Sequence, residues 1–264
     1  QKLGGKSVAA GILGGDTGRV IQASLEAMEL NTWFQFVEGE TRTNMKIKDP
    51  VNHTNTDINE PGVTVSEEIL STLLKELLKK VSQGDIVVIS GSMPKGSPKE
   101  TYYLWTKAFR EKGAKVFLDA DGELLKAGLK ASPYLIKPND HELSQLVGRT
   151  LETPEELEQV AKDLMKEYGI EKVVVSMGSA GALYVTKEKT LYAEGLKVPV
   201  GSTVGAGDSV VGALAVAEES GMSLEETVRL STATGAANVM CSGTQAADYK
   251  AIRELIPQVV YHQI

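Results

Sequence analysis

The alternation of short apolar runs with amphipathic helical stretches limits the fold of this 264-residue chain more than any other feature. We predict strands at residues 7–13, 85–90, 115–119, 134–136 and 172–176. Several of these runs are continuously apolar, as in IVVIS and VVVS, which is expected for strands buried on both faces of a parallel sheet. The sequence therefore predicts an α/β fold with helices on both faces of a mainly parallel central sheet.

Capping signals mark three helix starts. Ser97, Thr153 and Ser223 each stand three positions before a glutamate, and a proline directly follows Ser97 and Thr153. A hydroxyl N-cap, a proline in the first turn and a glutamate at the third helical position are typical of a helix N-terminus. Between residues 64 and 82, leucine, isoleucine and valine recur at helical spacing, which predicts an amphipathic helix with one face on the sheet.

Residues 32–61 break this rhythm with short alternating segments separated by Gly, Pro and Asn turns. We interpret them as a small β-layer, and the alternative is a β-meander that extends the sheet edge without a function of its own. The predicted organisation is thus an α/β domain formed by residues 1–31 and 62–264, interrupted by the β-layer of residues 32–61.

Charge and cysteine content exclude several classes of protein. A formal net charge of −7 argues against a broad basic surface for nucleic acid. Cys241 is the one cysteine, so intrachain disulfides and paired-thiolate metal sites are excluded and a reducing compartment is favoured. No apolar run approaches the roughly 18 residues of a membrane span. We predict a soluble, cytoplasmic protein without a nucleic-acid or membrane partner, and the start at Gln1 indicates that an upstream segment is missing.

The sequence Gly205-Ala206-Gly207-Asp208 carries the strongest chemical signal because a helix-like run follows it at once. Small residues at a helix start let backbone N–H groups approach an anion closely, and the helix dipole adds positive charge there. Asp208 would be stabilised as a carboxylate in that first turn and could accept a proton from a hydroxyl held against the same anion hole. The alternative is a glycine-rich turn in which Asp208 only caps the helix.

A second segment of small residues, Ser176-Met177-Gly178-Ser179-Ala180-Gly181, lies between two predicted strands. Small residues at the carboxyl end of a strand suit the close approach of a nucleotide at the edge of an open α/β sheet. An ordinary tight hairpin explains the same pattern, so this segment alone leaves both interpretations open.

Polar residues follow two other predicted strands. Asn139 and Glu142 are three positions apart and would share a face if a helix begins there. They could hold a hydrated Mg²⁺ ion or simply form a helix cap. Asp119 and Asp121 follow the strand at residues 115–119, where they could extend the surroundings of that metal or only terminate the strand.

Six short blocks follow one another along the chain: GETRTN (39–44), INEPG (58–62), VVISGSMPKG (87–96), IKPNDHEL (136–143), VSMGSAGAL (175–183) and STVGAGDS (202–209). Together they resemble the ribokinase-like carbohydrate kinases of the phosphofructokinase-B family. Within that family, the resemblance is strongest to the 1-phosphofructokinases. The resemblance runs from about residue 13 to the C-terminus and implies a ribokinase-like αβα sandwich in which residues 32–61 form part of a small β-sheet lid. The family's N-terminal substrate-binding aspartate and Gly-Gly-Lys-Gly motif have no match before residue 7.

The resemblance implies an ATP-dependent kinase that uses Mg²⁺, with Asp208 as the catalytic base and the segment from Gly205 to Asp208 as the anion hole. It assigns ATP contacts to the segment from Ser176 to Gly181 and places Lys137 near the transferred phosphate. It also places Asn238 near the nucleotide.

The same resemblance bears on the metal and the acceptor. Asn139 and Glu142 would organise Mg²⁺, directly or through water. Arg42 would pair with a phosphate that the substrate already carries, since a guanidinium fork suits a bidentate contact. The implied reaction is therefore phosphorylation of fructose 1-phosphate to fructose 1,6-bisphosphate. Tagatose-6-phosphate kinase, another sugar or phosphosugar kinase, and a non-catalytic sugar-phosphate sensor are the alternatives. A second copy of the chain, pairing through the lid, is the implied protein partner.

Overall fold

The computed structural model describes residues 1–49, 52 and 54–264, and internal contacts divide the chain into two compact units. The smaller unit holds residues 1, 6–80 and 92–98, and the larger unit holds residues 2–5, 81–91 and 99–264. The predicted lid of residues 32–61 belongs to the smaller unit, and its residues 50, 51 and 53 lie outside the described residues. The unit boundaries differ from the predicted division: residues 6–31 join the smaller unit because the strand at residues 8–14 pairs with the strand at residues 31–37, and residues 62–80 and 92–98 belong to that unit as well.

Among the described residues, a seven-stranded sheet forms the centre of the larger unit, in the order β11-β10-β9-β8-β7-β6-β5. Its strands are β5 (Ile86–Ser90), β6 (Lys115–Asp119), β7 (Leu135–Ile136), β8 (Lys172–Ser176), β9 (Gly181–Val185), β10 (Thr190–Glu194) and β11 (Tyr261–Gln263). Strands β5 to β8 are parallel, whereas β9, β10 and β11 are added by antiparallel pairing. The predicted α/β class with a mainly parallel sheet is confirmed.

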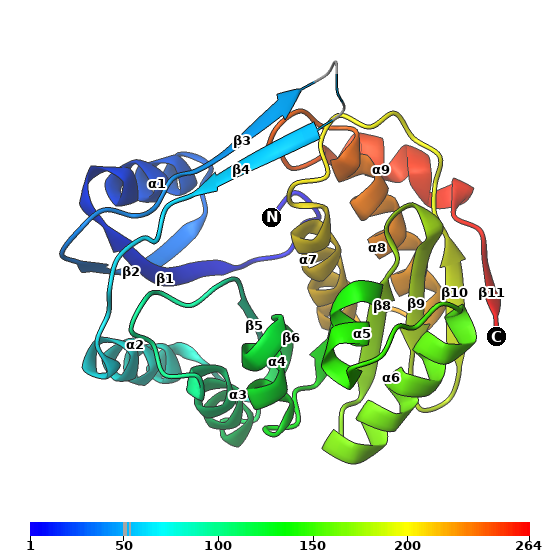
Figure 1. Ribbon diagram of the computed structural model, residues 1–264, viewed down its shortest axis with the longest axis horizontal. Coiled ribbons are helices and arrows are strands. Elements are labelled where there is room, and N and C mark those ends of the chain that lie inside the picture. Colours follow the sequence, from blue (N-terminus) through cyan, green and yellow to red (C-terminus); the bar gives the residue numbers. More distant parts are fainter. Residues whose placement is uncertain (50–51, 53) are drawn as a thin grey trace. The chain divides into compact units, whose positions relative to one another are not determined.

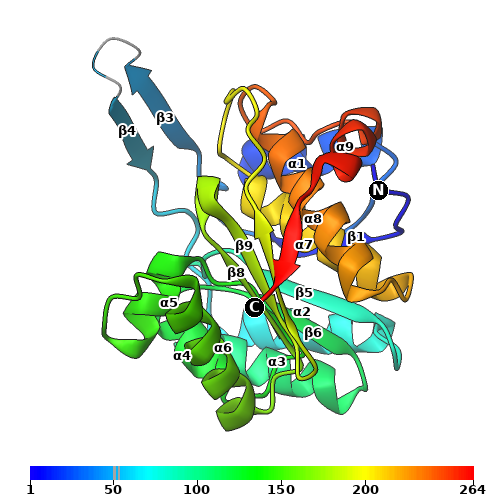
Figure 2. The same cartoon turned by 90° about the vertical axis from the view of Figure 1, so that its right-hand side faces the viewer.

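Helices cover both faces of this sheet (Figure 2). One face carries α3 (Thr101–Glu111), α4 (Gly122–Leu129), α5 (Asp140–Val147) and α6 (Pro154–Tyr168), and the other carries α7 (Ala206–Glu219), α8 (Leu224–Val239) and α9 (Tyr249–Leu255). Two 3-10 turns, η1 (Gly178–Ala180) and η2 (Ile256–Gln258), complete the unit. Phe117 and Val174 of the sheet share one buried cluster with Leu214 of α7 and Val228 of α8. This arrangement confirms the predicted αβα layering.

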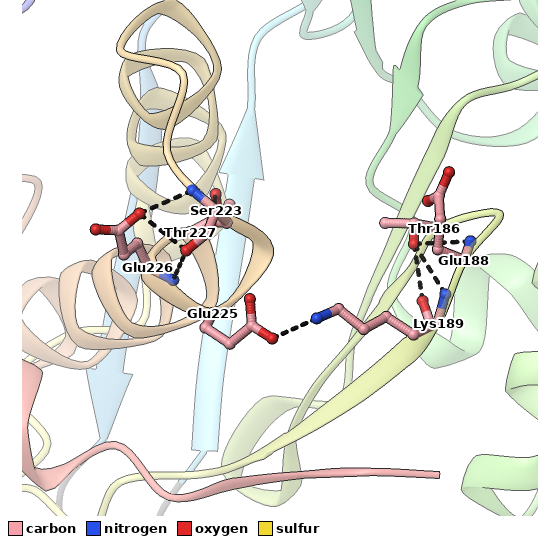
Figure 3. A network of polar contacts seen from close by, with 7 residues as sticks. All are labelled: Thr186, Glu188, Lys189, Ser223, Glu225, Glu226 and Thr227. Atoms are coloured by element: carbon pink, nitrogen blue, oxygen red, sulfur yellow. Dashed lines mark hydrogen bonds and ion pairs between the residues drawn. The ribbon is translucent and has the colours of Figure 1, made fainter.

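The capping signals at Thr153 and Ser223 are confirmed. Each of these hydroxyls caps its helix, α6 or α8, by accepting a hydrogen bond from the third helical residue. In return, that residue, a glutamate in both helices, accepts a bond from the backbone N–H of the cap. Figure 3 shows the box at the start of α8, beside the ion pair between Lys189 and Glu225.

The helix start predicted at Ser97 is wrong in position. Helix α3 begins at Thr101, and its N-cap is Glu100 rather than Ser97. The reason is that the Ser97 hydroxyl donates to the Pro94 carbonyl at 2.7 Å, which closes a turn before the helix instead of capping it.

The described part of the smaller unit contains two separate two-stranded sheets (Figure 1). Strand β1 (Val8–Gly14) leads into α1 (Gly15–Ala27) and pairs in parallel with β2 (Asn31–Val37). Strands β3 (Asn44–Asp49) and β4 (Thr54–Asn59) form an antiparallel pair, and α2 (Glu67–Lys80) follows. Residues 7–13 therefore form a strand as predicted but not in the central sheet, because β1 bonds to β2 instead. No helix in the described ranges is long and apolar enough to cross a bilayer.

Candidate active site

Helix α7 begins in the sequence predicted to form an anion hole. Gly205 is its N-cap and has a φ of +77°, a left-handed conformation that favours glycine. Because glycine has no side chain, nothing from the N-cap residue itself covers the first N–H groups of α7. Asp208 stands in the first turn and is exposed. The start of α7 thus combines N–H groups that can bind an anion with an accessible carboxylate.

Asn238, on α8, holds this loop and the start of α7 together. Its side chain is buried, its Nδ2 donates to the Val204 carbonyl at 3.2 Å, and its Oδ1 accepts from the Ser209 hydroxyl at 2.9 Å. Both polar atoms of Asn238 are therefore bonded within the protein. These contacts hold the loop and the first turn of α7 in place, and the predicted contact of Asn238 with the nucleotide stays a prediction.

Lys137 lies against the first turn of α7. A Cβ atom built on Gly207 would lie 3.4 Å from the Lys137 Nζ, so the absence of a side chain at Gly207 leaves room for the ammonium group. Lys137 is buried and forms an ion pair of 3.1 Å with Asp119 at the end of β6. The ammonium group of Lys137 is thus fixed between a carboxylate and the N-terminus of α7.

Negative charge accumulates around that ion pair. Burial raises the pKa of Asp119; Lys137 works in the opposite direction, and the nearby charges of Asp208 and Asp121 raise the pKa further. The pKa of Tyr102 is raised to about 12, chiefly by burial and further by the nearby carboxylates of Asp119 and Asp121. A site with this excess of carboxylates favours a cation or a cation-bound phosphate chain over a free anion.

Asn139 and Glu142 form the capping box of α5. The Glu142 N–H donates to Asn139 Oδ1 at 2.7 Å, and the Asn139 N–H donates to Glu142 Oε2 at 2.9 Å. The helix cap that the spacing left open is therefore present. The described residues contain no cluster of three His, Cys, Asp or Glu side chains suited to a metal, and the metal role of this pair stays a prediction.

The segment from Ser176 to Gly181 turns the chain from β8 into the antiparallel β9, so the hairpin interpretation is confirmed for its backbone. Gly181 has a φ of +116°, and a Cβ atom there would lie 1.9 Å from the Ala193 carbonyl oxygen. The Tyr192 hydroxyl donates to the Ala180 carbonyl at 2.7 Å. The turn is thus packed closely on the end of β10, and its contact with ATP stays a prediction.

The end of β8 lies beside the start of α5. The Ser176 N–H donates to the Pro138 carbonyl at 3.0 Å, and Asn139 and Ser176 form a parallel bridge. The two segments predicted to serve nucleotide and metal therefore adjoin within the larger unit.

Arg42 belongs to the smaller unit, where it bonds to another of the quoted sequence blocks. Its Nη2 donates to the Ser92 hydroxyl at 2.7 Å, and both side chains are exposed. Gly62, with a φ of +73°, lies close against the Cβ and methylene carbons of Arg42. Two segments of the smaller unit thus set the direction of the guanidinium group.

Sequence reasoning missed three polar partners at these sites: Ser209, Ser92 and Tyr192. Each bonds a predicted site residue or turn across a large sequence separation, so no local spacing marks it. For Ser209, its position directly after Asp208 in a helix was the available signal.

Comparisons with known proteins give consistent results. The family model described as "pfkB family carbohydrate kinase" matches residues 1–251. The 1-phosphofructokinase of Bacillus subtilis is 36% identical over 96% of this chain and 81% of its own length, and that of Escherichia coli K12 is 35% identical over 98% and 82%. Among solved structures, Escherichia coli phosphofructokinase-2 in complex with fructose-6-phosphate matches with a TM-score of 0.89, 30% identity and coverage of 97% and 83%. A possible 1-phosphofructokinase of Thermotoga maritima matches with a TM-score of 0.85, 28% identity and coverage of 100% and 84%.

Proposed function

We propose, from the premise that this chain belongs to the pfkB family of carbohydrate kinases, that it transfers the γ-phosphoryl group of ATP to the 6-hydroxyl of fructose 1-phosphate. Kinases of this family use ATP as the phosphoryl donor. Curated relatives similar over nearly the whole chain carry the name 1-phosphofructokinase. The choice of acceptor is supported by those names and by Arg42, and the choice of reaction by the site in the larger unit.

The observation that carries the proposal is the meeting of Lys137, Gly207 and Asp208 at the start of α7. Asp208 would accept the proton of the attacking 6-hydroxyl. The N–H groups in the first turn of α7 and the ammonium group of Lys137 would stabilise the negative charge on the transferred phosphoryl group. Because Asp119 and Asn238 fix these groups before substrate binds, positioning and electrostatics supply most of the acceleration.

The residues around Asn139 and Glu142 fit a magnesium ion held mainly through water. Magnesium commonly keeps several waters and binds proteins through one or two carboxylates. In the capping box, Asn139 and Glu142 each use one side-chain oxygen toward a backbone N–H. Glu142 therefore offers a second carboxylate oxygen next to the turn proposed for the nucleotide. When bound, magnesium would neutralise charge on the ATP phosphates.

Arg42 is the proposed recognition residue for the phosphate of the acceptor. The Ser92 hydroxyl takes one of the five N–H donors of its guanidinium group, and the exposed side chain offers the others. A guanidinium group that is already oriented loses less entropy when it binds a phosphate than a free one does.

A coupled assay of ADP release tests the acceptor and the reaction. Fructose 1-phosphate, tagatose 6-phosphate, fructose 6-phosphate and free fructose are compared in the presence of ATP and Mg²⁺. Selective turnover of fructose 1-phosphate supports the whole proposal, whereas preference for another acceptor keeps the kinase and changes its substrate. ADP release with none of the four above the background would contradict the proposed reaction and favour a sugar-phosphate sensor.

Replacement of the base tests the mechanism. We expect Asp208→Asn to lower kcat by roughly 100- to 10,000-fold, because the variant cannot accept the hydroxyl proton. Its thermal midpoint should stay near that of the wild type, since Asp208 is exposed. Asp163→Asn on the exposed face of α6 is the matched control. Near-normal turnover by Asp208→Asn would rule out Asp208 as the base.

A second copy of the chain is the proposed protein partner through the β3–β4 pair. Met45, Ile47 and Ile58 lie on one face of that pair by register and are about half exposed, at 56%, 49% and 52%. Apolar side chains gathered on a thin exposed sheet suit contact with another protein surface. Sedimentation should show a dimer that Ile47→Lys converts to a monomer; a monomeric wild type would contradict this partner.

A further inference from the structure

Thr41 ties the chain just before Arg42 to the end of β1. Its backbone N–H donates to the Gly14 carbonyl at 3.0 Å. Its hydroxyl accepts from the Gly14 N–H at 2.8 Å and donates to the Gly14 carbonyl at 3.2 Å. One threonine thus satisfies both backbone groups of Gly14, a buried residue, and holds the adjoining Arg42 to the same point.

Glu40 makes a second attachment, to the start of α1. Its Oε1 accepts from the Asp16 N–H at 3.0 Å and its Oε2 from the Thr17 N–H at 3.2 Å. The N-cap of α1 is Gly14, which supplies no side-chain cap, so the Glu40 carboxylate takes the place that an N-cap side chain fills in other helices. The helix dipole favours a negative charge at that position.

Gly15 shows how closely Glu40 fits. It has a φ of +61°, and a Cβ atom there would lie 1.8 Å from Glu40 Oε1. A side chain at Gly15 would therefore displace the Glu40 carboxylate from the helix. We call the contacts of Glu40 and Thr41 with Gly14, Asp16 and Thr17 the α1 latch.

We infer that Glu40 and Thr41 are positioning residues for Arg42, which the α1 latch holds in the direction needed to bind the acceptor's own phosphate. This inference rests on the proposed function of Arg42. A backbone tied on one side of Arg42, together with the Ser92 bond at the tip of its side chain, leaves the guanidinium group little freedom before substrate binds. Preorganised groups bind more tightly because less motion is lost on binding.

Kinetics of Thr41 variants with fructose 1-phosphate and ATP test the inference. We expect Thr41→Val, which keeps the shape and loses the hydroxyl, to raise the KM for fructose 1-phosphate by roughly three- to tenfold. The KM for ATP and the kcat should stay within about twofold, because both depend on the larger unit. Thr41→Ser keeps the hydroxyl and should restore the wild-type KM. Melting curves exclude variants that fail to fold.

The double variant Thr41→Val/Arg42→Ala separates positioning from a general structural role. Arg42→Ala alone should raise the KM for fructose 1-phosphate by roughly 30-fold or more. If the α1 latch acts through Arg42, Thr41→Val adds nothing on that background. An equal further rise in KM, or a parallel rise in the KM for ATP, would overturn the inference.

Gly15→Ala tests the role of Glu40 without changing Glu40 itself. It should raise the KM for fructose 1-phosphate as Glu40→Ala does. Because alanine at a φ of +61° is itself strained, melting curves must first show that the variants are folded; the KM of the double variant should then be no higher than that of Glu40→Ala, since the displaced carboxylate is gone. Glu38→Gln, at an exposed neighbour, is the control.

The outcomes for Arg42 and for the α1 latch are distinguishable. If Arg42→Ala leaves the KM for fructose 1-phosphate unchanged, the proposed role of Arg42 fails and the inference fails with it. If Arg42→Ala raises that KM while Thr41→Val and Glu40→Ala do not, the proposed function stands and the inference alone is wrong.

Discussion

Lys137 connects the stability of the larger unit to the chemistry proposed at the start of α7, because its ammonium group pairs with Asp119 and lies beside Gly207. Its partner Asp119 has a raised pKa because burial outweighs the attraction of Lys137, and the charge of Asp208 adds to the rise. An acid whose pKa is higher in the folded protein than in the unfolded chain favours folding as the pH falls, since protonation removes a buried charge. Removal of Lys137 should strengthen this pH dependence, because no positive charge then offsets the cost of burying the Asp119 carboxylate.

We expect Lys137→Met to lose roughly 2 kcal/mol of unfolding free energy at pH 7 and to regain part of that loss as the pH falls, because the pKa of Asp119 is raised and protonation removes its buried charge. Urea denaturation at pH 7, 6 and 5 measures the difference from the wild type. Asp119→Asn on the Lys137→Met background should remove the pH dependence. A loss that is equal at all three pH values would show that Asp119 is not its origin.

At the scale of single residues, the sequence was informative where the chemistry is local. Gly205, Gly207 and Asp208 are neighbours, and their place at a helix start followed from the residues themselves. The bond from Ser209 to Asn238 spans 29 positions and depends on how α7 packs on α8. Such a contact is fixed by tertiary packing, so no spacing rule within one segment could predict it.

At the scale of helices, the serine or threonine at two predicted N-caps can be compared directly, because one of them caps its helix and the other does not. Thr153 caps α6, whereas Ser97 lies in a turn before α3. We expect Thr153→Ala to lower the free energy of unfolding by about 1 kcal/mol and Ser97→Ala to lower it by less, because only Thr153 serves helix N–H groups. Urea midpoints at neutral pH measure both. A larger loss for Ser97→Ala would contradict this assignment of the caps.

The start of α5 shows why sequence left one pair of interpretations open. A helix cap and a magnesium site both need an oxygen-bearing side chain at a helix start and a carboxylate three residues later. Asn139 and Glu142 satisfy both requirements, and the structure shows the cap. The same three-residue pattern at Ser97 produced no cap, because a local turn took its hydroxyl.

At the scale of the whole chain, the α/β class followed from periodicity, since buried parallel strands and amphipathic helices each leave a local pattern. The strand that pairs with β1 could not be predicted from periodicity. Val8–Gly14 has the apolar character of a central strand, but it pairs with β2 and belongs to the smaller unit. Strand pairing depends on which edges meet in three dimensions, and an apolar run does not encode its neighbour.

An ionic cluster around Glu218 holds α7 to the sheet at the end of the helix opposite Asp208. Glu218 accepts hydrogen bonds from Lys115, from Lys172 at 2.6 Å and from the Tyr134 hydroxyl at 2.7 Å. These partners stand at the starts of β6 and β8 and just before β7, so the cluster joins α7 to three neighbouring parallel strands. Burial works to raise the pKa of Glu218, but the bonds from the two lysines and Tyr134 outweigh it and lower the pKa to about 2.

Stability of the larger unit should therefore depend on pH through Glu218. Its folded pKa lies below the ordinary glutamate value of 4.5, so the ionised carboxylate stabilises the fold fully above that value, and this stabilisation is lost as the pH falls toward 2. We expect Glu218→Gln to lower the free energy of unfolding by about 2 kcal/mol at pH 7 and by a little over half as much at pH 3.5, since the stabilisation is lost gradually between pH 4.5 and about 2. Urea denaturation at pH 7, 5 and 3.5 measures the difference, with Glu219→Gln at the exposed neighbour as control. Because only the wild type loses this ionised group on acidification, the two stability curves must converge; a gap of constant size would mean that packing of the Glu218 side chain, not its charge, holds α7 in place.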